Sequence, residues 1–152
     1  MSIRGLRFQT NQGDHIQTDH IFSFLNANDY LWYIDNLDTL DAELDINFNV
    51  RFTDGQQLLK DFSEHAVHAI FGEFFAFKKE NEHVSNEPEI NNWDDFVQSS
   101  AQIVVLIADC YYIDVYLKDP EVITSCFQFI SSRGFTPELI DQTDARYKFK
   151  VW

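Results

Sequence analysis

The sequence predicts an α+β fold: a single domain with one mostly antiparallel sheet and helices packed mainly on one face of that sheet. Three observations lead to this class. Apolar and polar residues alternate with a period of two in several segments, as they do in half-buried strands. Short polar turns join several of these segments, and short connections imply antiparallel hairpins. Apolar stripes with helical spacing lie between the strand-like segments.

Length and composition fit one globular domain over residues 1–152. The chain has 152 residues, of which 45% are hydrophobic, so a substantial core is available. A chain of this size buries roughly 70% of the surface that its unfolded form exposes. No linker rich in Pro, Gly or Ser divides the sequence. We therefore expect one domain without internal repeats.

Strand-like and helical patterns alternate in the first third of the chain. Residues 3–8 predict a first strand, and residues 14–25 place apolar side chains near one helical face. The aromatic-rich segment 30–34 favours a second strand. Residues 35–44 leave two interpretations open, because leucines at helical spacing favour a helix while Asn36 and the aspartates favour turns.

The middle third contains the clearest alternation. Residues 46–52 alternate between apolar and polar side chains, which predicts a half-buried strand. Thr53 and Gln56 have the spacing of a capping box, so a helix is expected to begin after Thr53. Residues 67–77 are apolar on both faces, interrupted by Glu73, and this pattern is typical of a central strand.

A hairpin is predicted after a short helix capped by Asn92. Residues 103–107 are five consecutive aliphatic side chains and are the best candidate for the buried centre of the sheet. Residues 113–117 alternate and follow a turn at 109–111, so they should pair with that central strand.

The last third predicts a helix and two strands. Asp119 is placed to cap a helix that has Pro120 at its first position, and Gly134 is the expected stop. Residues 135–140 and 145–152 flank a polar turn and predict two final strands.

The charge balance excludes some partners and favours others. The chain has 11 Lys and Arg against 25 Asp and Glu, which gives a net charge of −14. Such a field repels nucleic-acid backbones and anionic membrane surfaces, so neither partner is expected. It speeds encounter with a basic protein partner. The sequence does not determine the oligomeric state.

The sequence favours a cytoplasmic location. The N-terminus lacks the apolar run of a signal peptide. The longest apolar run, residues 103–108, is too short to span a bilayer. Cys110 and Cys126 form neither a disulfide framework nor a zinc motif, which suits a reducing compartment.

No catalytic residue, metal site or cofactor motif is predicted. His65 and His68 are three residues apart, but they lie at the entry to a predicted strand, where this spacing gives opposite faces. His15 and Asp19 are four apart and can pair on a solvated helix face. The five glycines form neither a phosphate loop nor a dinucleotide fingerprint. Non-enzymatic classes are therefore favoured, and no cofactor is expected.

One stretch of the sequence is acidic without any compensating base. No Lys or Arg occurs between Arg7 and Arg51, whereas eight Asp and Glu residues do. Aromatic side chains are interleaved with these acids, and rings beside carboxylates suit the recognition of Arg on a partner. The alternative is that the acids form only a solvated face. The candidate interaction patch consists of Asp29, Tyr30, Trp32, Tyr33, Asp35, Asp38, Asp41, Glu43 and Asp45.

Four segments give the chain a resemblance to a known family. They are RGLRF at residues 4–8, YLWYI at 30–34, DCYYIDVYLKD at 109–119 and RYKFKVW at 146–152. On these segments the chain resembles a family of small uncharacterised Firmicute proteins known only as a domain of unknown function. The resemblance implies a compact bacterial cytoplasmic domain. It implies no activity and no functional residues.

Three hypotheses follow for the function. The first is a non-catalytic protein interaction module, including an immunity-type inhibitor of a basic partner. The second is a small-molecule-binding or sensory domain, with aromatic residues of the sheet lining a pocket. The third, a small enzyme, is least favoured because no two candidate groups have a spacing that demands chemistry.

Overall fold

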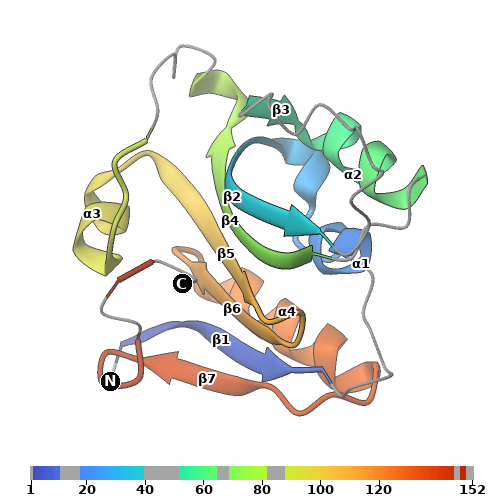
Figure 1. Ribbon diagram of the computed structural model, residues 1–152. Coiled ribbons are helices and arrows are strands. Elements are labelled where there is room, and N and C mark those ends of the chain that lie inside the picture. Colours follow the sequence, from blue (N-terminus) through green and yellow to red (C-terminus); the bar gives the residue numbers. More distant parts are fainter. Residues whose placement is uncertain are drawn as a thin grey trace.

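The computed structural model describes residues 2–10, 18–39, 52–64, 69–81, 88–145 and 148–149. Within them, seven strands form one antiparallel sheet in the order β3-β2-β4-β5-β6-β1-β7 (Figure 1). The predicted α+β class and antiparallel sheet are confirmed. The strands are β1 (Ile3–Gln9), β2 (Tyr30–Thr39), β3 (Phe52–Asp54), β4 (Ala69–Lys78), β5 (Ala101–Ala108), β6 (Tyr112–Leu117) and β7 (Glu138–Asp141).

Helices cover the two faces of the sheet unequally. α1, α2 and α4 pack on one face, called here the three-helix face, and α3 packs on the other, called the α3 face (Figure 1). The expectation of helices mainly on one face is thus confirmed. No helix among the described residues is long and apolar enough to cross a membrane. The helices are α1 (Thr18–Ser23), α2 (Gly55–Glu64), α3 (Trp93–Gln98) and α4 (Pro120–Ser132), with short 3-10 turns η1 (Ala27–Asp29) and η2 (Lys79–Asn81).

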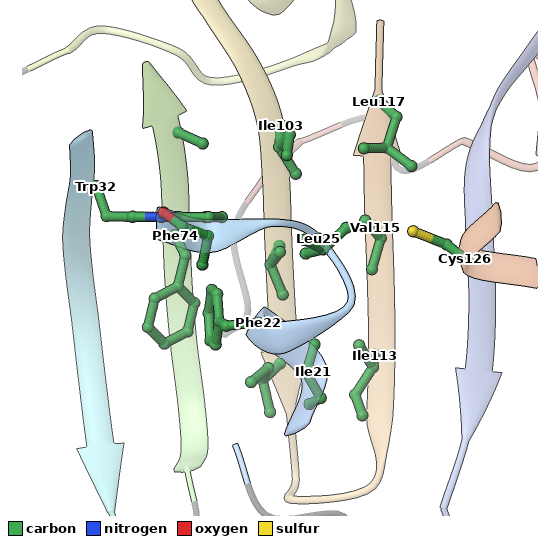
Figure 2. Close-up of a cluster of buried hydrophobic side chains, with 14 of the residues drawn as sticks. Ile21, Phe22, Leu25, Trp32, Phe74, Ile103, Ile113, Val115, Leu117 and Cys126 are labelled. Carbon is green, nitrogen blue, oxygen red and sulfur yellow. The ribbon is translucent and has the colours of Figure 1, made fainter. Parts of the chain in front are cut away.

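Aliphatic side chains and a group of aromatic rings together form the core on the three-helix face (Figure 2). Phe22 of α1 meets the ring of Trp32 edge-on, with centroids 4.9 Å apart, and contacts Phe74 at 4.8 Å. The Trp32 indole donates a 3.1 Å hydrogen bond to the Ala27 carbonyl, so its one polar atom is satisfied. Cys126 of α4 lies against the same core, as the sequence pattern of its helix suggests.

A second core lies on the α3 face. Tyr116 of β6 packs on Phe149 with ring centroids 4.7 Å apart, and Phe96 of α3 joins them. The Phe149 amide donates a 2.7 Å hydrogen bond to the Asn91 carbonyl, which ties the end of the chain to the segment before α3. The sheet is therefore buried from both sides.

Burial from both sides explains why β5 was recognisable in the sequence. β5 is the middle strand of the seven, and its residues 103–107 are all buried. It pairs with β6 through the predicted hairpin. The turn between them places Asp109 and Cys110 at positive φ, and the Cys110 amide donates to the Ile70 carbonyl of β4. This tertiary hydrogen bond supports a backbone conformation that non-glycine residues rarely adopt.

The ends of α4 follow the local signals in the sequence. The Asp119 side chain accepts from the Glu121 amide, and Pro120 occupies the first turn, as predicted. After the helix, Gly134 has a φ of 88°, and the Phe135 amide returns to the Ile130 carbonyl. This hydrogen bond and the left-handed Gly134 are the features of a Schellman motif, in which a left-handed residue is required after the helix.

Two local predictions are corrected. The cap of α2 is Asp54, whose carboxylate accepts from the Gln56 amide, whereas the Thr53 hydroxyl donates to the Asp54 carbonyl. Residues 35–39 form neither a helix nor a turn, because they continue β2 and pair with β4. The register shifts between Asp35 and Asp38, and Asn36 there has a φ of 51°. The expected conformations of residues 14–17, 40–51, 65–68, 146–147 and 150–152 lie outside the described residues.

Candidate functional site

The structure divides the predicted interaction patch. Asp29 and Asp38 are exposed, whereas Tyr30 and Asp35 are half-buried. Asp29 lies in η1 and Asp38 near the far end of β2, roughly 25 Å away along the strand, because eight residues of β2 separate them at about 3.3 Å each. They therefore do not form one compact surface. Asp41, Glu43 and Asp45 lie outside the described residues.

The prediction of exposed rings is wrong for Trp32 and Tyr33. Trp32 is 0% exposed on the three-helix face, and Tyr33 is 1% exposed on the α3 face. Neighbouring residues of a strand point to opposite faces, and both faces of β2 are covered here. These two rings are core residues and offer no contact area to a partner.

The strand register assembles a row of charged side chains across the α3 face. Each member stands opposite the next on the neighbouring strand, and one apolar residue interrupts the row. Glu73 and Asp114 are the buried acids of the row. In strand order the members are Asp35, Glu73, Leu106, Asp114, Arg7 and Glu138.

Arg7 and Asp114 form a fork-like ion pair at one side of the row. The distances are 2.7 Å from Nε to Oδ1 and 2.8 Å from Nη2 to Oδ2. The Tyr116 hydroxyl also donates to Asp114 at 3.4 Å. The hydrogen bonds to Asp114 raise the pKa of the Arg7 guanidinium. Both groups are engaged within the sheet, so their role is to fix the pairing of β1 with β6.

At the other side of the row, Asp35 and Glu73 stand directly opposite each other on β2 and β4. Such cross-strand pairs bring Cβ atoms to about 4.5–5.5 Å, where like charges destabilise a sheet. Asn36 moderates this contact, because its side-chain amide donates to Glu73 while its backbone amide donates to Asp35 at 2.9 Å. The β-bulge at Asn36 directs its side chain toward Glu73.

These two acids line a cavity of about 310 Å³ on the α3 face. Glu89 adds a third carboxylate from the segment that precedes α3. Buried Phe75 and Ile90 provide apolar wall, so the cavity combines negative charge with hydrophobic contact. This combination suits a cationic group carried on an apolar stem. The lining residues are Asp35, Glu73, Phe75, Pro88, Glu89, Ile90 and Asn91.

Sequence reasoning found only Asp35 of this acidic cavity. Glu73 did give a signal, because it was the one charge within an otherwise apolar strand, 67–77. Glu89 gave none, since an acid in a polar loop is ordinary. Cross-strand register brings the three together, and register is not visible in a single sequence.

The remaining candidate groups do not form a reactive site. His20 is exposed on α1, and the other four histidines lie outside the described residues. Burial, with Asp109 and Asp38, raises the pKa of Cys110, and burial raises that of Cys126 to about 12. Neither thiol is therefore activated as a nucleophile. Among the described residues no group of three or more His, Cys, Asp or Glu is placed to hold a metal ion.

Comparison with known proteins gives one match. Residues 3–150 match the model of a family described as "Protein of unknown function (DUF2691)". No curated protein and no solved structure matches the chain. The match spans nearly the whole sequence, including the strands that build the acidic cavity. The chain therefore belongs to this family of proteins of unknown function.

Proposed function

We propose that the protein is a non-catalytic interaction module whose acidic cavity receives an Arg or Lys side chain of a basic partner. The observation that carries this proposal is the convergence of Asp35, Glu73 and Glu89 on one cavity. An immunity-type inhibitor of a basic protein is the narrower form of the same proposal.

The cavity has the chemistry that a guanidinium needs. Carboxylates accept its N–H groups, and bidentate pairing gives both energy and direction. Phe75 and Pro88 supply surface for the aliphatic stem of the same side chain. The volume of about 310 Å³ admits one long side chain rather than a folded segment. The net charge of −14 then steers a basic partner toward the molecule.

The position of Asp35 also supports binding over a purely structural role. Asp35 stands directly opposite the buried Glu73, a place in a sheet where a second acid is in general less favourable than a neutral residue. Residues that reduce stability are concentrated at sites where binding requires them. A cationic partner group would be attracted by both carboxylates.

A titration with paired peptides tests the proposal. The probe is a short arginine peptide with acetylated and amidated ends, and its control is the same peptide with citrulline, which keeps the shape of arginine without its charge. Calorimetry at low salt should give binding of the arginine peptide alone. The double variant Asp35→Asn, Glu89→Gln should weaken that binding about tenfold or more, since each lost contact removes a charge-assisted hydrogen bond.

The matched control variant is Asp29→Asn, Asp38→Asn. It changes the net charge by the same amount, but both residues are exposed and neither lines the cavity. It should weaken binding less than threefold, as loss of general steering does. Equal losses in the two double variants would mean that the overall field, and not the cavity, binds the peptide. Equal binding of the citrulline peptide would also reject the proposal.

A further inference from the structure

A second cavity on the α3 face has the opposite character. Its volume is about 390 Å³, at the small end of the range for ligand sites. Arg4 enters it from β1, Trp93 from α3 and Lys148 from the end of the chain. Asn91 lines this cavity as well as the acidic one. The lining residues are Arg4, Asn91, Asn92, Trp93, Asp94, Gln142, Ala145 and Lys148.

Arg4 is held in place by an aromatic ring and interacts electrostatically with Asp141 of β7. Its guanidinium carbon lies 4.9 Å from the centre of the Trp93 ring, so the indole face supports it by a cation–π contact. Its Nε is buried and has no hydrogen-bond partner among the described residues. None of the ion pairs formed by the described part of the chain includes Arg4 or Lys148. A guanidinium held on a ring, with its Nε free to donate, suits the binding of an anion.

Most other described cations already have a partner. Arg4 and Lys148 instead line this polar cavity together. Two cations at one cavity stand out in a chain with 11 basic and 25 acidic residues. The engaged cations are Arg7 with Asp114, Lys60 with Glu64, Lys79 with Asp54, Lys118 with the Ser99 carbonyl, and Arg133 with the Phe129 ring.

We propose that this cavity binds a small carboxylate ligand. Two cations and one acid, Asp94, line it, and Asp141 of β7 interacts with Arg4 from beside it, so the site favours a ligand with a single negative charge. A phosphate dianion would leave excess negative charge within a molecule of net charge −14. Asn92 and Gln142 offer amide groups that suit a ligand carrying its own amide or hydroxyl beside the carboxylate.

The test uses N-acetylglycine as the probe and N-acetylglycinamide as its neutral counterpart. Titration calorimetry on the full chain should detect the acid and not the amide. Arg4→Gln should weaken binding about tenfold, as loss of a charged hydrogen-bond donor does. Lys148→Gln should weaken it less, because this side chain is exposed. Inorganic phosphate, at matched ionic strength, should bind more weakly than N-acetylglycine.

Two variants serve as matched controls. Arg133→Gln removes an arginine that also stacks on a ring, at 5.0 Å from Phe129, but is not among the residues that line this cavity. Lys60→Gln removes an exposed lysine on α2. Neither should change binding by more than twofold. If Arg4→Gln fails to fold, Arg4→Lys and Lys148→Gln decide the question, because Arg4→Lys keeps the charge while losing the planar fork.

Three results would overturn the inference. They are equal binding of acid and amide, unchanged binding in both Arg4→Gln and Lys148→Gln, and tighter binding of phosphate than of the carboxylate. The probe carries no positive charge, so its binding is independent of the acidic cavity. The arginine peptide has blocked ends, so its result is likewise independent of this second cavity.

Discussion

Arg7 and Asp114 face each other across β1 and β6 and are joined by two hydrogen bonds of 2.7 and 2.8 Å. The two partners differ in exposure, because the Asp114 side chain is 1% exposed and that of Arg7 is 35% exposed. When Asp114 is removed, water can therefore solvate the Arg7 guanidinium. When Arg7 is removed, water cannot reach the Asp114 carboxylate. Removing one partner is thus not equivalent to removing the other.

Arg7→Met should destabilise the fold more than Asp114→Asn does. The first leaves a buried carboxylate without its guanidinium and should cost about 3 kcal/mol, while the second should cost about 1–2 kcal/mol. Urea denaturation of both variants measures the difference. Adding Asp114→Leu to Arg7→Met should recover part of the loss, since the buried charge is then gone. Equal costs in the single variants would contradict this account.

Asp35→Asn should stabilise the fold by about 0.5 kcal/mol, because it removes a like charge directly opposite Glu73. The amide keeps an oxygen that can accept from the Asn36 backbone amide. Thermal denaturation compares it with Asp38→Asn, an exposed acid of the same strand, which should have no effect of this size. A loss of stability in Asp35→Asn would show that the carboxylate supports the fold.

Asp54→Ala should destabilise the fold by about 1 kcal/mol at pH 7, the usual cost of losing a helix cap. The hydrogen bond with Lys79 and the bond from the Gln56 amide lower the pKa of Asp54. A lowered carboxyl pKa gives stability that is present above the ordinary value of 3.8 and is lost as pH falls through the folded-state pKa. The difference from the parent protein should therefore disappear in acid. Thr53→Ala, the neighbouring residue, should show no such dependence on pH.

The buried Cys126 thiol should make the free energy of unfolding fall at alkaline pH. Burial raises its pKa from 9.0 to about 12, so the thiol stays neutral in the folded chain while it ionises in the unfolded one. The stability contributed by this group is present below pH 9 and falls between pH 9 and 12 by about 1.4 kcal/mol per pH unit. The free energy of unfolding of Cys126→Ala should fall less steeply over this range. Parallel curves for the two proteins would refute the prediction.

Gly134→Ala should cost about 1 kcal/mol through backbone strain alone. The residue has a φ of 88°, yet an added Cβ would meet no atom within 4 Å. Ser132→Ala, two residues earlier in α4, provides the control for a change that keeps helical backbone. Denaturant titration measures the stability of both variants. Equal losses in Gly134→Ala and Ser132→Ala would mean that backbone strain at residue 134 is not the cause.

Structural features that depend on a few neighbouring residues were predictable from the sequence. Asp119, Pro120 and Gly134 set the limits of α4 because a helix end is satisfied by groups within one turn. The centre of the sheet was predictable for another reason. Residues 103–107 are apolar at every position, and only a strand covered on both faces needs this composition.

The candidate site was mostly not predictable, because its parts meet through strand pairing. Asp35 and Glu73 are far apart in sequence and become opposite only in one register of β2 and β4. The burial of Trp32 and Tyr33 depends on what covers each face of β2, which is set by distant helices and by the end of the chain. Composition could place acids and rings in one segment, but it could not say which of them reach solvent.

The position of β1 in the sheet has a consequence for the order in which the strands can pair during synthesis. β1 comprises residues 3–9, yet its sheet neighbours are β6 and β7, at residues 112–117 and 138–141. As the chain leaves the ribosome, β1 must wait for more than a hundred further residues to be made before either neighbour exists. Pairing of β1 is therefore a late step in the folding of this sheet, and Arg7 brings its charge to Asp114 only at that step.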